Sequence, residues 1–244
     1  MSDNKNSILE LKGVDVFHGD LQAVYGADMQ IQRGSMVSLI GANGAGKSTL
    51  LNAIMGIHKP KNGKIHWKGE DITGMPTSKI VGRGISLTPE GSRIFEDMTV
   101  LENLLLGAYP PRARTGKKAN LEKVYETFPV LKEKASQYAS FLSGGQRQML
   151  AIARAIMASP ELIICDELSL GLAPVIIKDI YASLRRIGAD GVTFLLVEQE
   201  VKRCLKYTDY AYVMVKGRIV MQGRCDELPE NEVSDAYFGV NKFA

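Results

Sequence analysis

The chain has 244 residues, of which 45% are hydrophobic and 23% charged, and its formal net charge is +3. This length allows one large domain or two small ones with ample core, and the composition is ordinary for a globular protein. The small net charge gives no indication of a nucleic-acid partner. No stretch approaches the roughly eighteen consecutive apolar residues of a membrane span. Because the first residues also lack the apolar core of a signal peptide, we expect a cytoplasmic protein.

The first part of the chain predicts several strands and one helix. Ile8 to Phe17 and Ala27 to Gln32 alternate apolar and polar residues, as half-buried strands do. Val37 to Ile40 is a short apolar run typical of a buried strand, and Leu50 to Met55 continues as a helix. Lys64 to Lys68 predicts a further strand after a Pro- and Gly-containing turn. We therefore expect a strand, turn and helix unit flanked by antiparallel strands.

The turn inside that unit fits the phosphate-binding pattern G-x-x-x-x-G-K-[ST]. Gly41, Gly46, Lys47 and Ser48 occupy its four fixed positions. Glycines let the backbone N–H groups surround a polyphosphate, and the following helix directs its positive end at the same anion. By average composition this pattern recurs in roughly one chain in a hundred of this length. We interpret the turn as a nucleoside triphosphate site, in which Lys47 reaches the outer phosphates and Ser48 holds Mg²⁺.

The middle of the chain predicts helices and loops and no strand. Ile85 to Thr88 is a core strand that runs into this segment, and Pro110 with Pro111 starts a charged loop. We expect a helical subdomain over residues 89–159, inserted in a mixed α/β domain formed by residues 1–88 and 160–244. Its predicted helices are Val100–Ala108 with Thr99 as its cap, Asn120–Phe128 ending at Pro129, and Gly145–Ala158, and a short helix capped by Thr77 or Ser78 precedes them.

The last part of the chain alternates strand, helix and strand, which indicates a parallel sheet covered by helices. These elements are predicted at Leu162–Asp166, Val175–Ile187 and Thr193–Val197, followed by a hairpin near Lys216 and then two short helices. Two carboxylates, Asp166 and Glu167, end the first strand, and ligand sites lie at such strand ends. Asp166 suits the hydration shell of Mg²⁺, and Glu167 suits the water that attacks a γ-phosphate.

A second candidate anion site lies at Leu142–Gln146, which reads Leu-Ser-Gly-Gly-Gln and opens the long helix. This pentapeptide arises by composition in roughly one such chain in several thousand. With it, the whole chain resembles the ATP-binding-cassette (ABC) ATPases. The resemblance implies a RecA-like P-loop core with an antiparallel β subdomain and an inserted helical subdomain.

The resemblance assigns site residues by motif. It implies ATP contacts from the Walker A loop, which comprises Gly41, Asn43, Gly44, Ala45, Gly46, Lys47, Ser48 and Thr49. Leu162–Glu167 matches Walker B with Glu167 as the catalytic glutamate. Ser143, Gly144, Gly145 and Gln146 match the family signature, which faces the ATP held by the opposite subunit. The site is then complete only in a dimer.

Several positions depart from the general family pattern. Glu90 occupies the place of the glutamine that links γ-phosphate and Mg²⁺ to the transporter, and Gln199 replaces the switch histidine. Leu168 follows the catalytic glutamate where proline is usual. His18 or Phe17 takes the place of the tyrosine that stacks on adenine, and the sequence leaves both open.

Most departures resemble one subgroup, the branched-chain amino-acid (Liv-type) importers, and within it the shorter of two ATPase subunits. The segments that carry this resemblance are Pro89–Phe95, Ser169–Pro174, Val197–Gln199 and Asp235–Gly239. The subgroup implies ATP and Mg²⁺, a companion ABC ATPase or a second copy, two transmembrane permease subunits and, indirectly, an extracytoplasmic binding protein. It implies a location on the inner face of the cell membrane, where Arg93 and Phe95 contact the permease.

Three other functions are alternatives to a Liv-type importer ATPase. A related importer for urea or short amides differs only in subunits that this chain does not include. A non-transport cassette that acts on ribosomes or DNA usually joins two cassettes in one chain or carries a long coiled coil, and this chain shows neither. A P-loop kinase or GTPase is contradicted by Leu142–Gln146.

Overall fold

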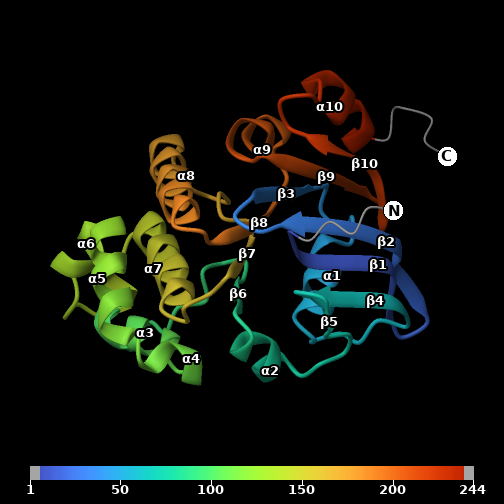
Figure 1. Ribbon diagram of the computed structural model, residues 1–244. Helices are drawn as coiled ribbons and strands as arrows, with labels where there is room; N and C mark the ends of the chain where they lie inside the picture. The colour runs from blue at the N-terminus through green and yellow to red at the C-terminus, as the bar shows by residue number, and fades with distance from the viewer. Residues whose placement is uncertain (1–5, 239–244) are drawn as a thin grey trace. The chain divides into compact units, whose positions relative to one another are not determined.

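The computed structural model describes residues 6–238, and the contacts divide the chain into two compact units. The first unit is Met1–Ile80 with Thr193–Ala244, and the second is Val81–Val192. Figure 1 labels the helices and strands of both units. The helical subdomain expected at residues 89–159 falls within the second unit, and its boundaries stay a prediction.

The antiparallel sheet of the first unit is built from four strands in the order β2-β1-β4-β5. Its strands are β1 (Ser7–His18), β2 (Leu21–Gln32), β4 (Asn62–Trp67) and β5 (Glu70–Asp71). The alternation in β1 places Leu9, Leu11, Val14 and Val16 in the core. β2 starts six residues before the predicted Ala27, because its ladder with β1 continues to the pair His18 and Leu21 across a two-residue turn.

The second sheet of this unit carries the strand that leads into the phosphate loop. β3 (Met36–Ile40) lies between β8 (Thr193–Glu198) and β9 (Tyr210–Val215) and is parallel to both. All five residues of β3 are buried, as expected for a strand covered on both faces. β10 (Arg218–Arg224) pairs antiparallel with β9 and completes the predicted hairpin. α1 (Lys47–Ile54) follows β3 directly after the loop.

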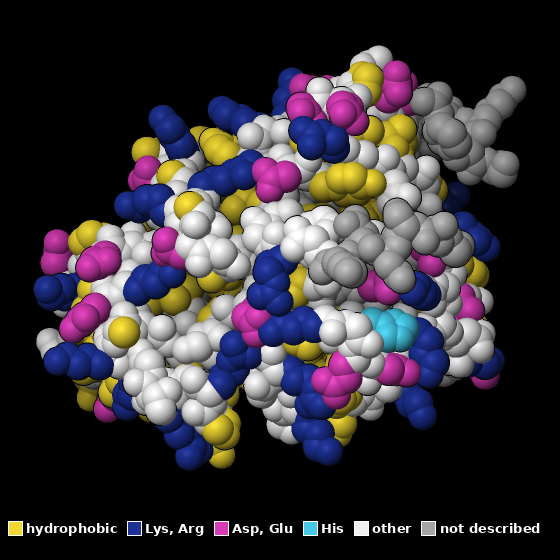
Figure 2. Space-filling view, in the orientation of Figure 1, with side chains coloured by type: hydrophobic (Ala, Val, Ile, Leu, Met, Phe, Trp, Pro, Cys, Tyr) yellow, Lys and Arg dark blue, Asp and Glu magenta, His cyan; other side chains and the backbone are white. Residues whose placement is uncertain are grey.

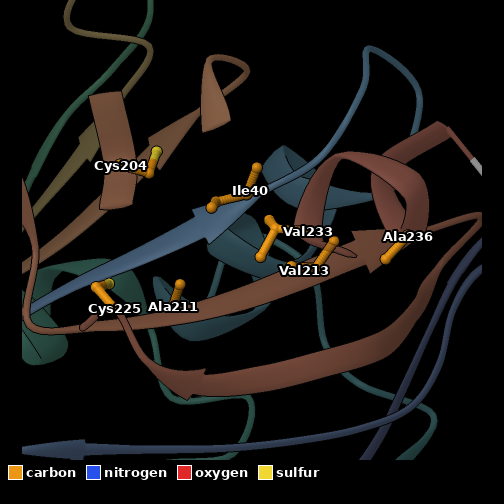
Figure 3. Close-up of a cluster of buried hydrophobic side chains, with 7 residues drawn as sticks. All are labelled: Ile40, Cys204, Ala211, Val213, Cys225, Val233 and Ala236. Carbon is orange, nitrogen blue, oxygen red and sulfur yellow. The ribbon is translucent and has the colours of Figure 1, made fainter. Parts of the chain in front are cut away.

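A compact apolar cluster joins this sheet to the C-terminal helices (Figure 3). The cluster consists of Ile40, Cys204, Ala211, Val213, Cys225, Val233 and Ala236, and it involves α9 (Val201–Tyr207) and α10 (Glu230–Phe238). The prediction of two helices after the hairpin is wrong for the residues up to 238, since α9 precedes β9 and only α10 follows β10. A helix is the usual connection between β8 and β9, because both strands run parallel to β3 and need a crossover.

The second unit combines a pair of parallel strands, β6 (Ile85–Thr88) and β7 (Leu162–Asp166), with a set of helices. The helices are α3 (Val100–Gly107), α4 (Pro111–Arg114), α5 (Lys117–Thr127), α6 (Pro129–Glu133), the 3₁₀ turn Ala139–Phe141, α7 (Gly144–Ile156) and α8 (Pro174–Ala189), while α2 (Thr77–Gly82) begins in the first unit. No strand is assigned between positions 90 and 159, as predicted. The three long predicted helices of this unit's middle segment are confirmed.

Two short helices of this unit were not predicted from the sequence. Pro111 begins α4 instead of a loop, and Pro129 both ends α5 and begins α6. Proline stops the helix before it, yet it suits the first position of a new helix because its missing N–H would lack a partner there anyway. The Thr99 cap is confirmed in detail, since its hydroxyl and the Glu102 side chain satisfy each other's backbone N–H groups at the start of α3.

The surface carries charges of both signs. On the face shown in Figure 2, basic and acidic side chains are interspersed, as the small net charge predicts. Within residues 6–238, no helix combines the length and hydrophobicity that crossing a bilayer requires.

Candidate nucleotide site

The phosphate loop, Gly41–Thr49, has a backbone that only glycine fits at key positions. Gly44 has a φ of 77° and Gly46 a φ of 101°, in the left-handed region that strains other residues. A Cβ atom on Gly46 would lie 2.7 Å from the carbonyl oxygen of Ala23. A Cβ on Gly41 would lie 2.5 Å from the carbonyl oxygen of Met214. The glycines of the motif are therefore required by the fold around the loop as well as by any ligand.

The loop holds a cation and leaves amide donors available. Lys47 is buried, and its ammonium donates to the carbonyl oxygens of Gly41 at 2.8 Å and Ala42 at 3.0 Å. No carbonyl in the described part of the backbone accepts a hydrogen bond from the amides of Asn43, Gly44 or Gly46. An ammonium group and backbone N–H groups beside a helix N-terminus are the donors that a polyphosphate needs. The loop of this chain therefore fits a nucleoside triphosphate.

Of the two residues expected at the adenine, His18 is the one that contacts the phosphate loop. Its Nε2 lies 3.0 Å from the hydroxyl of Thr49 at the start of α1, and its ring meets His58 edge-on at 4.7 Å. The Phe17 ring, by contrast, has the Lys61 ammonium over it at 4.4 Å from the centroid. Since side chains alternate along β1, these two neighbours have different surroundings, and His18 is the one beside the phosphate loop.

The end of β8 brings Gln199 toward the same loop. The carbonyl of Glu198, the last residue of the strand, accepts a hydrogen bond from the Gly41 amide at 3.3 Å. Gln199 follows immediately and is half-buried. The Glu198 carboxylate is buried and has the Arg203 guanidinium at 3.9 Å. The residue before Gln199 is therefore bonded to Gly41, the first glycine of the phosphate loop.

In the second unit, β7 ends in the two acidic residues predicted from the sequence. All five residues of β7 are buried, including Asp166 at its end. Glu167 has a φ of 51°, an uncommon value for a residue other than glycine, which turns the chain away from the strand line. Such backbone strain clusters at functional sites. Leu168 is 1% exposed, so apolar packing holds the turn where proline is usual.

The signature motif forms a capped helix start. Ser143 is the N-cap of α7, its hydroxyl accepts from the Gln146 amide at 3.4 Å, and the Gln146 side chain accepts from the Ser143 amide at 3.1 Å. Gly144 is exposed, whereas a Cβ on Gly145 would lie 2.7 Å from Cγ2 of Ile176 in α8. The two glycines therefore have different roles, one at the surface and one in helix packing.

The loop after Glu90 is clasped by the helix that begins at the signature. Glu90 is exposed, and the next three residues have positive φ angles of 76°, 61° and 38°. The Ser92 hydroxyl donates to Gln148 at 2.6 Å, and the Arg154 guanidinium donates to the Arg93 carbonyl at 2.7 Å. Burial lowers the pKa of Arg154. α7 thus holds the loop that was predicted to contact a partner.

Two further polar residues that the sequence reasoning missed complete this clasp. Asn103 is fully buried and bonds both the amide and the carbonyl of Phe95, each at 2.9 Å. Arg147 pairs with Glu96 at 2.8 Å and donates to two carbonyls of the turn before Ser143. The sequence signal that could have identified these residues is a polar side chain at a helix position where the pattern predicts an apolar one.

The site residues thus fall into two groups. The first unit brings together Lys47, Ser48, Thr49, His18 and the strand end before Gln199. The second unit holds Glu90, Asp166, Glu167 and the signature residues. That both groups act on one nucleotide stays a prediction.

A sequence profile described as ABC transporter matches residues 24–169, from β2 through the phosphate loop and the signature to the end of Walker B. The chain belongs to the ABC transporter family. A curated ABC relative, the high-affinity branched-chain amino acid transport ATP-binding protein BraG of Pseudomonas aeruginosa, is 43% identical over 95% of this chain and 100% of its own length. The high-affinity branched-chain amino acid transport ATP-binding protein BraF of the same organism is 32% identical over 95% of this chain and 98% of its own length.

A solved structure agrees with this assignment. An ABC transporter's ATP-binding cassette in its ADP conformation is 32% identical, covers 95% of both chains and has a TM-score of 0.81. The fold is therefore that of an ABC ATPase cassette, and the chain is an ABC ATPase. The expected resemblance to the Liv-type group is confirmed by the relatives.

Proposed function

We propose that this ABC ATPase supplies the energy for an importer of branched-chain amino acids. The observation that carries the proposal is the 43% identity with BraG over the full length of that protein. Identity with BraF is lower, at 32%, which supports the BraG type of subunit, the shorter of the two. The segments that suggested this subgroup from sequence include Gly239, which lies outside the described residues.

The phosphate loop is the proposed binding site for the triphosphate of ATP. Its amides from Asn43 to Thr49 surround the phosphates, and Lys47 exchanges its two loop carbonyls for the outer phosphate oxygens. His18 is our candidate for the adenine ring, because it lies against Thr49 at the start of α1. Phe17 is the weaker candidate, because Lys61 covers its ring.

The proposed residues for Mg²⁺ are Ser48, Asp166 and Glu90, whose hydroxyl and carboxylate oxygens are the hard donors that this ion prefers. When bound, the ion neutralises charge that develops on the phosphates. Glu167 is the proposed general base or orienting group for the attacking water. Gln199 can hydrogen-bond that water or the γ-phosphate, but its amide cannot carry a proton as an imidazole can.

The signature residues Ser143–Gln146 are proposed to act on the ATP of a second cassette. BraG and BraF are two ATP-binding proteins of one organism with the same transport name. This pairing supports a companion ATPase over a second copy of this chain. The loop Gly91–Phe95, whose Phe95 is 52% exposed, is the proposed contact for two permease subunits. The ATPase would then lie on the inner face of the membrane, and an extracytoplasmic binding protein would act through the permease.

The test is reconstitution of this chain with its companion ATPase, the permease subunits and the binding protein in lipid vesicles. We expect leucine, isoleucine or valine on the binding protein to stimulate ATP hydrolysis and to enter the vesicles. Stimulation by urea or a short amide alone would replace the proposed substrate class. Hydrolysis stimulated by ribosomes or DNA, and by no transport subunit, would overturn the transport role.

A further inference from the structure

A two-residue turn far from the phosphate loop in sequence packs directly against it. The turn joins β9 to β10 and consists of Lys216 and Gly217, with φ angles of 46° and 81°. The strand pairing resumes at once with Val215 opposite Arg218. Two successive positive φ angles are characteristic of the tight hairpin turn whose twist matches the strands. Gly217 is buried although it sits at the tip of a hairpin, which is unusual for a loop tip.

Gly217 is held on both sides by backbone hydrogen bonds. Its amide donates to the carbonyl of Ala45 in the phosphate loop at 2.9 Å. Its own carbonyl accepts from the amide of Tyr25 in β2 at 2.8 Å. Gly217 thus bridges β2 and the phosphate loop, so the tip of the β9–β10 hairpin is hydrogen-bonded directly to that loop.

There is no room for a side chain at this junction. A Cβ on Gly217 would lie 2.5 Å from the carbonyl oxygen of Ala23 and 2.7 Å from the Tyr25 ring. The Gly217 Cα would in turn lie 3.4 Å from a Cβ built on Gly46. Three backbone segments therefore meet at van der Waals distance, which two facing glycines allow.

The hydrogen bond to Ala45 fixes the orientation of a peptide group within the phosphate loop. The carbonyl of Ala45 and the amide of Gly46 belong to the same planar trans peptide unit, in which the two groups point in opposite directions. Because the carbonyl points to Gly217, the Gly46 amide points away from the hairpin. That amide donates to no carbonyl in residues 6–238, so the orientation leaves one phosphate donor in place before ATP arrives.

We infer that Gly217 is a positioning residue of the nucleotide site, which sets the peptide between Ala45 and Gly46 for phosphate binding. The inference rests on the proposed nucleotide role of the phosphate loop. A donor that is already oriented costs no reorganisation when the ligand binds, and this preorganisation raises affinity. Loss of the hairpin contact should therefore weaken ATP binding in a chain that still folds.

The first test compares Gly217→Ala with a matched control, Gly34→Ala. Gly34 has a φ of 75°, a Cβ there meets nothing within 4 Å, and its amide contact with Thr193 survives in alanine. Both variants should melt earlier than wild type, because both force alanine into a left-handed conformation. Titration with a fluorescent ATP analogue and Mg²⁺ should show a Kd raised about tenfold for Gly217→Ala, or ~1.4 kcal/mol. The Kd of Gly34→Ala should stay within about twofold of wild type.

A second measurement uses the wild-type chain, so it does not depend on whether a variant folds. If the Gly217 hydrogen bond favours nucleotide binding, the nucleotide must strengthen that bond by the same factor. Saturating Mg-ATP should therefore slow hydrogen exchange at the Gly217 amide and leave the Gly34 amide unchanged. An unchanged exchange rate at Gly217, or a Gly217→Ala variant with wild-type affinity, overturns the inference.

The nucleotide role itself is tested separately by Lys47→Ala in the same titration. A wild-type chain that binds no analogue, or a Lys47→Ala variant that binds it normally, overturns the proposed phosphate site and the inference together. If Lys47→Ala loses affinity while Gly217→Ala keeps it, the site stands and only the role of Gly217 falls.

Discussion

The phosphate loop and the signature motif are both glycine-rich starts of a helix, yet they are built in opposite ways. α1 has Gly46 as its N-cap and no side-chain cap. α7 has Ser143 as its N-cap, and Gln146 completes a reciprocal pair of hydrogen bonds. The start of α1 thus has no capping side chain, whereas the start of α7 satisfies part of its own backbone amides.

The basic side chains at the two helix starts also differ in the groups that they contact. Lys47 is held over its own loop by two loop carbonyls. Arg147, in the first turn of α7, is directed at carbonyls of the preceding turn and at Glu96. The phosphate loop therefore has both the cation and the backbone donors that a triphosphate needs. The signature can add only a few exposed donors, so it fits a ligand that is already held elsewhere.

The largest expected effect comes from removing the cation of the phosphate loop. Lys47→Ala should abolish ATP hydrolysis and weaken ATP binding by about a hundredfold, because charge-assisted hydrogen bonds contribute roughly 1.5–3 kcal/mol each. Thermal shift with Mg-ATP measures binding, since a ligand raises the melting temperature of the native state. Lys79→Ala, at an exposed lysine of α2, is the control. A normal shift and normal turnover in Lys47→Ala would show that the loop is not the phosphate site.

Glu167→Gln should separate binding from chemistry. The neutral amide keeps the shape of the side chain but cannot act as a base, so turnover should fall by about 10² to 10⁴. Nucleotide binding at the phosphate loop should remain, as measured by the same thermal shift. The matched control is Glu122→Gln, at an exposed glutamate of α5. Undiminished turnover would transfer the catalytic role to another residue, and Glu90 would be examined first.

Ser143→Arg tests whether the signature acts on a nucleotide held by another chain. Bulk and charge should block closure of two cassettes, so hydrolysis by the assembled transporter should fall by about tenfold or more. ATP binding by the isolated chain should not change. Ser143→Thr, which keeps a capping hydroxyl, is the control for lost helix stability.

Light scattering of Glu167→Gln with its companion ATPase gives an independent measurement of the same closure. ATP should drive association of this pair, and Ser143→Arg should prevent it. Wild-type hydrolysis by Ser143→Arg in the assembled transporter, together with no ATP-driven association in any mixture, would refute the shared site.

Gln199→His should have a smaller effect. Either side chain can hydrogen-bond the γ-phosphate or the water, so we expect activity within about tenfold of wild type. The pH profile of wild-type hydrolysis should contain no step that depends on position 199. The profile of the Gln199→His variant should gain a step near neutral pH, where imidazole titrates. An inactive Gln199→His variant would indicate that the glutamine has a role specific to this subgroup.

The smallest expected effect is on the pH dependence of stability, in which the two reciprocal helix caps of the second unit should differ. Hydrogen bonds from Thr99 lower the pKa of Glu102, whereas Gln146 in the cap of α7 does not titrate. A carboxyl whose pKa is lowered on folding stabilises the native state at neutral pH, and that contribution is lost as pH falls through the folded pKa. Glu102→Gln should therefore reduce the loss of stability between roughly pH 5 and pH 3 in urea unfolding. An unchanged acid response would show that the cap of α3 does not contribute.

Local signals in the sequence accounted for most of the elements. The phosphate-loop strand and helix, the Thr99 cap and the Leu162–Asp166 strand were all predicted close to their observed bounds. Each depends on neighbours within a few residues, such as a hydroxyl before a helix or a glycine at a positive φ. The short helices α4 and α6 and the order of α9 and the hairpin were missed. A proline fits the end of one helix and the start of the next equally well, so its local signal is ambiguous.

The chemistry proposed for this protein could be predicted from sequence, because the phosphate loop, the paired carboxylates and the signature are contiguous motifs whose residue types indicate particular ligands. Tertiary packing was needed to show that His18 lies beside the phosphate loop while Lys61 covers the Phe17 ring, and that α7 holds the loop after Glu90. It also revealed Gly217 against Ala45, 172 residues apart in the chain. Such contacts form when distant segments pack, and backbone hydrogen bonds between them leave no pattern of side chains to read.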